Sequence, residues 1–214
     1  MLLSLKDLVE AYIDLDEEKV LKIAENLLKS GGDPAEIIEA CRSATNIIGE
    51  KFERGEYFLS ELILAGEIFN SVMRIVLPQL KKEIKPIGII VLGTVQGDIH
   101  DIGKNIFKAF AEAAGFKVID LGVDVPPEKF VEAIRDYKPD TVGMSCLLTA
   151  GIESMKKTVD AIKEASLRDM VKIIIGGGRV DKTTCEYTGA DAWTNDAATG
   201  VRIILKWAEE KRGR

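Results

Sequence analysis

Hydrophobic positions recur every three to four residues through the first 80 positions, the spacing of amphipathic helices. Four helices are predicted, beginning near Leu5, Asp16, Asp33 and Tyr57, with the last one ending near Pro78. Aspartate followed by proline, as at Asp33, is a typical start signal for a helix. Because the connections between the four segments are short, the pattern predicts an N-terminal four-helix bundle.

After a charged run ending in proline at 81–86, the hydrophobic pattern changes. Short β-branched runs now alternate with helical segments, which is typical of a parallel sheet in an α/β domain. We therefore predict an α/β protein with a helical domain at 1–84, a linker and hinge at 81–86, and a five-stranded parallel, Rossmann-like (flavodoxin-like) domain at 85–214. The predicted strands are Ile87–Leu92, Lys117–Leu121, Thr141–Ser145, Lys172–Ile175 and Ala192–Trp193.

Composition and charge narrow the function classes. The formal net charge is -6 and aromatic residues make up only 6% of the chain, which argues against nucleic acid or anionic lipid as the partner. Three cysteines without a CxxC pair, together with an N-terminus lacking a basic leader, predict a cytoplasmic protein with reduced thiols that is not in a membrane. A single histidine, His100, excludes sites built from two or more imidazoles of one chain.

The unusual residues fall at the carboxyl ends of three predicted strands. These are the loop Gly93–Gly103, the segment Ser145–Thr149 and the glycine run Gly176–Gly178. Ligands of doubly wound sheets bind at this edge. The chain has neither GxGxxG after the first strand nor GxxxxGK[ST] anywhere, so dinucleotide and nucleoside triphosphate binding are disfavoured. The glycine run instead offers bare backbone that a bulky ligand can approach closely.

Within the first loop, Asp98 stands two residues before His100. A carboxylate so placed can bind one ring nitrogen of the imidazole and leave the other directed outward, as is typical of a metal-ligating histidine. A lone histidine is more often structural, and that alternative stands beside metal ligation.

The pattern Asp98-x-His100-x-x-Gly103, Ser145-x-Leu147 and Gly176-Gly177 resembles the DxHxxG…SxL…GG signature of cobalamin-binding domains. The gaps of 41 residues (104–144) and 28 residues (148–175) are similar to the spacing in that family. The helical half is also similar, through 54–62, to the cap module of methionine synthase and of small corrinoid proteins. The resemblance thus covers nearly the whole chain.

The resemblance implies a role for each matched residue. His100 would be the lower axial ligand of cobalt in the base-off, His-on mode, and Asp98 would bind the other ring nitrogen. Further residues would line the path of the displaced nucleotide tail, and two cap residues would lie over the upper face of the corrin ring. The tail residues are Gly103, Ser145, Leu147, Thr149, Gly176 and Gly177; the cap residues are Phe58 and Leu62.

The implied function is that of a corrinoid methyl carrier in one-carbon metabolism, active only with partner enzymes. Cobalamin or a related corrinoid, as cob(I)alamin and methylcobalamin, would take a methyl group from a substrate-specific methyltransferase. The acceptor would be tetrahydrofolate or a thiol on a second methyltransferase, and a reductive activating protein would also be a partner. Two alternatives remain open: a small cobalamin-binding subunit of an adenosylcobalamin-dependent mutase, and a cobalamin-dependent regulator.

Some residues have competing interpretations. Phe58 and Leu62 could be plain bundle core. We expect Asp101 and Lys104, although they lie inside the first motif, to be solvated residues of the first helical turn. At 151, where methionine synthase carries a hydroxyl residue that completes a relay with the histidine and aspartate, this chain has glycine. Either the relay ends at Asp98 and water, or another hydroxyl such as Thr149 replaces it.

Overall fold

The structure, a computed structural model, describes residues 4–80 and 85–212. The chain divides into two compact units, residues 1–85 and 86–214. Residues 81–84 of the predicted linker lie outside the described ranges. Within the described residues, no helix has both the length and the hydropathy needed to span a membrane.

Within residues 4–80, the first unit contains four α-helices, as predicted: α1 (Leu5–Ile13), α2 (Glu17–Lys29), α3 (Pro34–Glu53) and α4 (Leu59–Val76), followed by the short 3-10 helix η1 (Leu77–Gln79). Their starts are set by local hydrogen bonds. The Asp16 side chain accepts from the backbone of the third helical residue, and the Asp33 side chain accepts from Ala35 N. In the buried interior, the Tyr12 hydroxyl donates to the Ala65 carbonyl over 2.7 Å, which ties α1 to α4.

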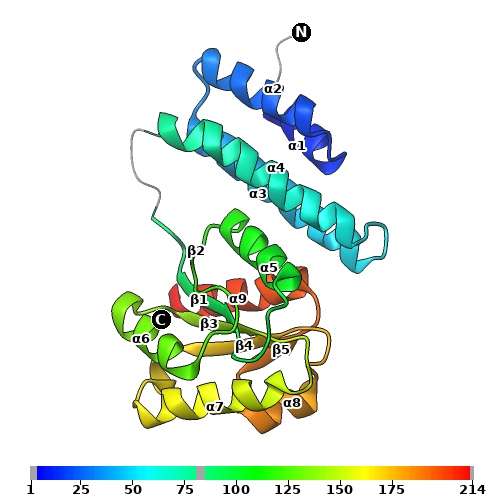
Figure 1. Cartoon of the computed structure of the whole chain (residues 1–214). Helices are drawn as coiled ribbons and strands as arrows, with labels where there is room; N and C mark the ends of the chain where they lie inside the picture. Colours follow the sequence, from blue (N-terminus) through cyan, green and yellow to red (C-terminus); the bar gives the residue numbers. More distant parts are fainter. Residues whose placement is uncertain (1–3, 81–84, 213–214) are drawn as a thin grey trace. The chain divides into compact units, whose positions relative to one another are not determined.

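The second unit is a five-stranded parallel sheet in the order β2-β1-β3-β4-β5 (Figure 1). The strands are β1 (Ile89–Thr94), β2 (Lys117–Asp120), β3 (Thr141–Ser145), β4 (Lys172–Gly176) and β5 (Ala192–Thr194). The predicted fold class is confirmed. Strand β1 begins two residues later than predicted. The Asp140 carboxylate accepts from Ile89 N at the strand start, and before it the Ile87 N–H donates to the Gly115 carbonyl in the loop before β2.

Helices cover both faces of this sheet. Helices α5 and α9 lie on one face and α6, α7 and α8 on the other (Figure 1). Their bounds are α5 (Ile102–Ala113), α6 (Pro127–Tyr137), α7 (Gly151–Glu164), α8 (Lys182–Thr188) and α9 (Ala197–Arg212), with the 3-10 helix η2 (Arg168–Met170) before β4. The chain reverses direction across the sheet between β1 and β3, so the topological switch point lies at the carboxyl ends of these two strands.

The strand register aligns the predicted site residues in one row. Thr94 of β1 pairs with Ser145 of β3, Ser145 pairs with Gly176 of β4, and Gly176 pairs with Thr194 of β5. The Asp98–His100 loop, the Ser145 segment and the glycine run therefore all leave the same edge of the sheet.

Candidate functional site

The loop between β1 and α5 is held rigidly on the sheet edge. Val95 forms a bridge with Val125, and the Thr94 hydroxyl donates to the His100 carbonyl over 3.0 Å. Gly97 N donates to the Asp124 carboxylate over 2.7 Å, and Asp124 N donates in turn to the Asp98 carbonyl. These bonds fix the backbone on both sides of Asp98 and His100.

Asp98 is fully buried and both of its carboxylate oxygens are occupied. Oδ1 accepts from His100 N over 3.0 Å and lies 2.6 Å from His100 Nδ1. Oδ2 accepts from the backbone N–H groups of Leu147 and Leu148, over 2.6 and 2.9 Å. The first and second motifs of the sequence therefore meet at this one carboxylate.

These contacts keep Asp98 ionised. Burial on its own would raise its pKa, but the hydrogen bonds from the His100 backbone, Leu148, the His100 ring and Leu147 outweigh burial and hold the pKa well below its usual range. An ionised carboxylate only accepts hydrogen bonds, so the proton of the neutral imidazole lies on Nδ1. Nε2 then keeps its lone pair.

Nε2 is the free end of this arrangement. The His100 side chain is 48% exposed, and within residues 4–80 and 85–212 no hydrogen-bond partner of Nε2 is found. A histidine whose inner nitrogen is fixed by a buried carboxylate and whose outer nitrogen is accessible fits the role of a single metal ligand. The predicted pair is thus brought together in the predicted orientation.

The segment after β3 contributes mainly its backbone. Ser145 is half-buried at the strand end, whereas Leu147 and Thr149 are exposed at the sheet edge. Sequence reasoning assigned the side chains of this segment to the tail path and missed the two N–H groups of Leu147 and Leu148 that hold Asp98. Only the close three-dimensional approach of the two loops reveals that role.

The matched glycines are needed for different reasons. Gly177 has φ +134, and a Cβ there would lie under 3.0 Å from the Cys146 carbonyl, so this chain's own backbone requires glycine. At Gly103 a Cβ would meet no atom within 4 Å, and at Gly176 its nearest neighbour would lie at an ordinary 3.6 Å. Open space therefore lies beside Gly103, whereas a side chain at Gly176 would begin in contact with Thr194 but would not collide with it. Neither glycine is required by a clash within the described chain, so the bare backbone fits close approach by a bulky group from outside.

The expectation for Lys104 is wrong. This lysine is only 4% exposed, because its Nζ lies 2.7 Å from both carboxylate oxygens of Asp120 and 2.9 Å from Asn105 Oδ1. The partner stands 16 residues further on, at the end of β2. The expectation for Asp101 is confirmed, since it is exposed at the start of α5 and accepts from the Asn105 side chain.

Position 151 has no room for a hydroxyl side chain. A Cβ on Gly151 would lie under 3.0 Å from Cys146 Sγ. Thr149, the alternative considered from the sequence, is exposed, and within the described chain no hydrogen bond joins its side chain to Asp98. Cys146 Sγ instead fills the space beside Gly151 and donates to the Leu148 carbonyl over 2.8 Å.

The two cap residues differ in exposure. Leu62 is 1% exposed and lies on the side of α4 that carries the buried residues Ala65, Phe69 and Val72, whereas Phe58, just before the helix, is 68% exposed. Phe58 N donates to the Glu61 carboxylate, which fixes the start of α4. Contact of either residue with a corrin ring stays a prediction.

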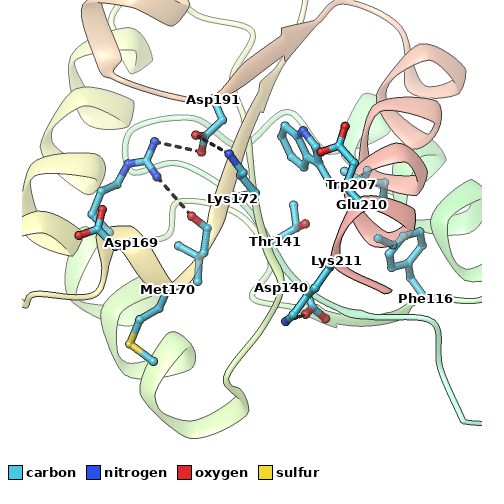
Figure 2. Close-up of a pocket in the computed structure, with 14 residues that line it drawn as sticks. Phe116, Asp140, Thr141, Asp169, Met170, Lys172, Asp191, Trp207, Glu210 and Lys211 are labelled. Carbon is cyan, nitrogen blue, oxygen red and sulfur yellow. Dashed lines mark hydrogen bonds and ion pairs between the residues drawn. The ribbon is translucent and has the colours of Figure 1, made fainter. Parts of the chain in front are cut away.

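A cavity of about 390 Å³ lies at the opposite, amino-terminal edge of the sheet (Figure 2). Five of its charged residues pair with one another: Asp191 lies 2.9 Å from Arg168 and 3.4 Å from Lys172, and Asp140 pairs with Lys211. Two further acidic residues, Asp169 and Glu210, also line it. Figure 2 shows Asp191 next to Lys172 and Asp140 next to Lys211.

Comparison with known proteins identifies the family of the chain. The B12 binding domain family matches residues 88–202, and a second B12 binding domain family matches residues 4–77. The chain is 38% identical over 203 residues to trimethylamine corrinoid protein 1 of Methanosarcina acetivorans, covering 92% of this chain and 94% of that one. It is 34% identical over 200 residues to dimethylamine corrinoid protein 2 of the same organism, covering 92% of each.

Solved structures show the same architecture. A cobalamin-binding protein from Desulfitobacterium hafniense has a TM-score of 0.81 and 42% identity, covering 95% of this chain and 98% of that one. The methanol:cobalamin methyltransferase complex of Methanosarcina barkeri has a TM-score of 0.84 at 24% identity, covering 96% and 79%, and shows a common fold. Taken with the Asp98–His100 pair and the open glycine edge, these matches show that the chain belongs to the cobalamin-binding corrinoid proteins of methyltransferase systems.

Proposed function

We propose that this protein carries a methyl group between two partner enzymes on a cobalamin bound base-off, with His100 Nε2 as the lower axial ligand. The observation that carries the proposal is the His100 ring, whose Nδ1 is held by a buried carboxylate while its other nitrogen is exposed. Bound cobalamin supplies a cobalt centre that accepts and donates a methyl group. The protein sets the axial ligand and controls access.

Asp98 would set the properties of this ligand. By accepting a hydrogen bond from Nδ1, the carboxylate fixes the orientation of the ring and strengthens Nε2 as a donor to a metal.

The sheet edge supports a path for the displaced nucleotide tail. Ser145 and Gly176 are paired neighbours on adjacent strands, and the exposed Leu147 and Thr149 follow Ser145. Gly103 faces open space and Gly176 presents bare backbone next to Ser145, while Gly177, which the close approach of Cys146 requires, continues the run without a side chain. We assign these residues to tail binding.

In the helical unit, Phe58 is the better of the two cap candidates, because it is exposed while Leu62 is buried. We propose that Phe58 shields the upper face of the corrin ring and that Leu62 supports α4 from the bundle core. A Phe58→Ala variant should lose bound methylcobalamin to photolysis faster than wild type under the same illumination. Equal rates would remove Phe58 from the cap.

The partners follow from the same proposal. Relatives of this chain are named for trimethylamine and dimethylamine, so methyltransferases for methylated amines are the first donors to assay. The acceptor would be tetrahydrofolate or a thiol on a second enzyme, with a reductive activating protein restoring the lowest cobalt state. The mutase alternative has less support, since the helical unit matches a B12 binding family of its own.

The decisive experiment uses the single histidine. Reconstituted wild-type protein in the Co(II) state should show nitrogen superhyperfine splitting from one protein imidazole in its EPR spectrum, and His100→Ala should lose it. No second histidine exists in the sequence to replace it. Added free imidazole should restore the splitting in the variant. Labelling the protein with nitrogen-15 distinguishes a protein nitrogen from the benzimidazole nitrogen of the cofactor, and a protein-derived splitting that persists in His100→Ala without added imidazole would show that His100 is not the ligand.

A further inference from the structure

Cys146 is a buried thiol that the proposed function does not use. It is 1% exposed and lies between Ser145 and Leu147 in the segment that supplies two N–H groups to Asp98. Burial, and next the neighbouring Asp98 carboxylate, raise the pKa of this thiol to about 12. The thiol therefore keeps its proton at neutral pH and is a hydrogen-bond donor, not a nucleophile.

The thiol holds one peptide group of this segment in place. Cys146 Sγ donates to the Leu148 carbonyl over 2.8 Å, and Gly151 N donates to the same oxygen over 2.9 Å. The N–H of Leu148 donates to Asp98 Oδ2 over 2.9 Å. Fixing the carbonyl thus fixes the orientation of the residue whose N–H holds Asp98.

Gly151 provides the space that the thiol occupies. A Cβ at 151 would come under 3.0 Å from Sγ, and its next neighbours, Cys146 Cβ and Val95 Cγ2, would lie at 3.5 Å. The thiol and the missing side chain are therefore complementary: one fills the volume that the other leaves.

We propose that Cys146 is a positioning residue for the cobalt ligand and that Gly151 is its obligate steric partner. Cys146 would hold the Leu148 carbonyl, the Leu148 N–H would in turn hold Asp98, and Asp98 would orient His100. The inference rests on the proposed ligand role of His100. It assigns no contact between the thiol and the cofactor.

Four variants separate the hydrogen bond from packing. Cys146→Ala removes both, and Cys146→Ser keeps a donor at the same position. Cys146→Ala combined with Gly151→Ala refills the space with a methyl group but restores no donor. Gly151→Ala alone, with Cys146 present, should be destabilised in thermal unfolding because the new methyl meets Sγ, and the double variant should recover that stability.

The readout is EPR of the cobalamin-loaded Co(II) protein. Cys146→Ala and the double variant should both show a ratio of histidine-bound to unbound cobalt about fivefold below wild type, the effect of one ordinary hydrogen bond. Cys146→Ser should stay near the wild-type ratio. A wild-type ratio in the double variant would overturn the proposal, because packing alone would then suffice. If Cys146→Ala does not fold, the double variant carries the same test.

Amide hydrogen exchange of the full chain without cofactor distinguishes this inference from the ligand assignment. The Leu148 amide should exchange faster in Cys146→Ala and in the double variant than in wild type or Cys146→Ser. If the wild-type EPR spectrum lacked the imidazole splitting, the proposed ligand would be wrong, yet exchange would still decide the role of the thiol. Unchanged exchange in both alanine variants would overturn it.

Discussion

The two edges of the sheet use aspartate in opposite ways. At the amino-terminal edge, Asp140 and Asp191 accept from strand N–H groups, at 2.8 Å from Ile89 and 2.7 Å from Ile173. Each also pairs with lysine or arginine side chains of this chain (Figure 2). At the carboxyl edge, Asp98 likewise accepts from the backbone, but its side-chain partner is an imidazole with an open second nitrogen.

This difference separates a structural carboxylate from a functional one. At the amino-terminal edge, Asp140 and Asp191 are each paired with a cation of this chain, so these two carboxylates hold the strand starts and are not available to a ligand. Asp98 instead holds the inner nitrogen of an imidazole whose outer nitrogen is exposed. A paired carboxylate at a strand start is therefore a poorer ligand-binding group than the half-exposed histidine beside Asp98.

The largest effect is expected from Gly177→Ala. The new methyl would collide with the Cys146 carbonyl at a backbone φ that favours glycine, so the free energy of unfolding should fall on the order of 4 kcal/mol, or folding should fail. Gly176→Ala is the matched control, because its Cβ has an ordinary neighbour distance of 3.6 Å. Chemical denaturation of both variants measures the contrast.

Cofactor titration of the same pair then tests the tail path. Gly176→Ala should fold like wild type but bind cobalamin more weakly, since the methyl would enter the open backbone surface. Wild-type affinity in a stable Gly176→Ala protein would remove this glycine from the path.

Next in size is Asp98→Asn compared with Asp191→Asn. Both carboxylate oxygens of Asp98 accept hydrogen bonds, so an asparagine would have to place its NH₂ group against the backbone donors or the His100 ring. The free energy of unfolding should therefore fall by about 3 kcal/mol. The EPR signal of histidine-bound cobalt should also weaken. Asp191→Asn loses charge on its pairs with Arg168 and Lys172, an effect of about 1 kcal/mol, with an unchanged cobalt spectrum. Equal spectral effects would abolish the proposed distinction between the two edges.

A smaller effect is expected in the acid range. Because the pKa of Asp98 is lower in the folded chain than in the unfolded chain, the folded state binds fewer protons as the pH falls through the ordinary aspartate range. The stabilisation is complete above about pH 4 and is lost as the pH falls toward the folded value. Urea unfolding between about pH 5 and 3 should show a shallower decline for Asp98→Asn than for wild type, and parallel curves would contradict this.

The sequence predicts best those features that depend on residues close together along the chain. The helix starts at Asp16 and Asp33 depend on hydrogen bonds two or three residues away, and the strands depend on runs of β-branched residues, so both were predictable. The Asp98–His100 contact is equally local. The fold class followed from the alternation of these elements.

The missed features all depend on residues far apart in sequence. Burial of Lys104 in α5 is stabilised by Asp120 at the end of β2, and the support of Asp98 comes from N–H groups 49 and 50 residues away. From the sequence, Gly151 stood out only because it replaces a hydroxyl residue of methionine synthase. In the structure, the Cys146 thiol fills the space that a side chain at 151 would need. The pairing of β1 with β3 and β4 brings the Asp98 loop next to the segment after Ser145, and the pairing of β1 with β2 places Asp120 near α5.

The smallest effect should come from Lys211→Ala. This lysine pairs with Asp140 but its side chain is 73% exposed, so solvent screens the pair, and its loss should lower the free energy of unfolding by about 0.5 kcal/mol. Asp140 keeps its bond from Ile89 N, so β1 and the loop that it carries should not move. Thermal unfolding and cobalamin titration of the same preparation test both statements. A clear loss of cobalamin affinity would show that the amino-terminal edge influences His100 through β1, and the two edges would no longer be independent.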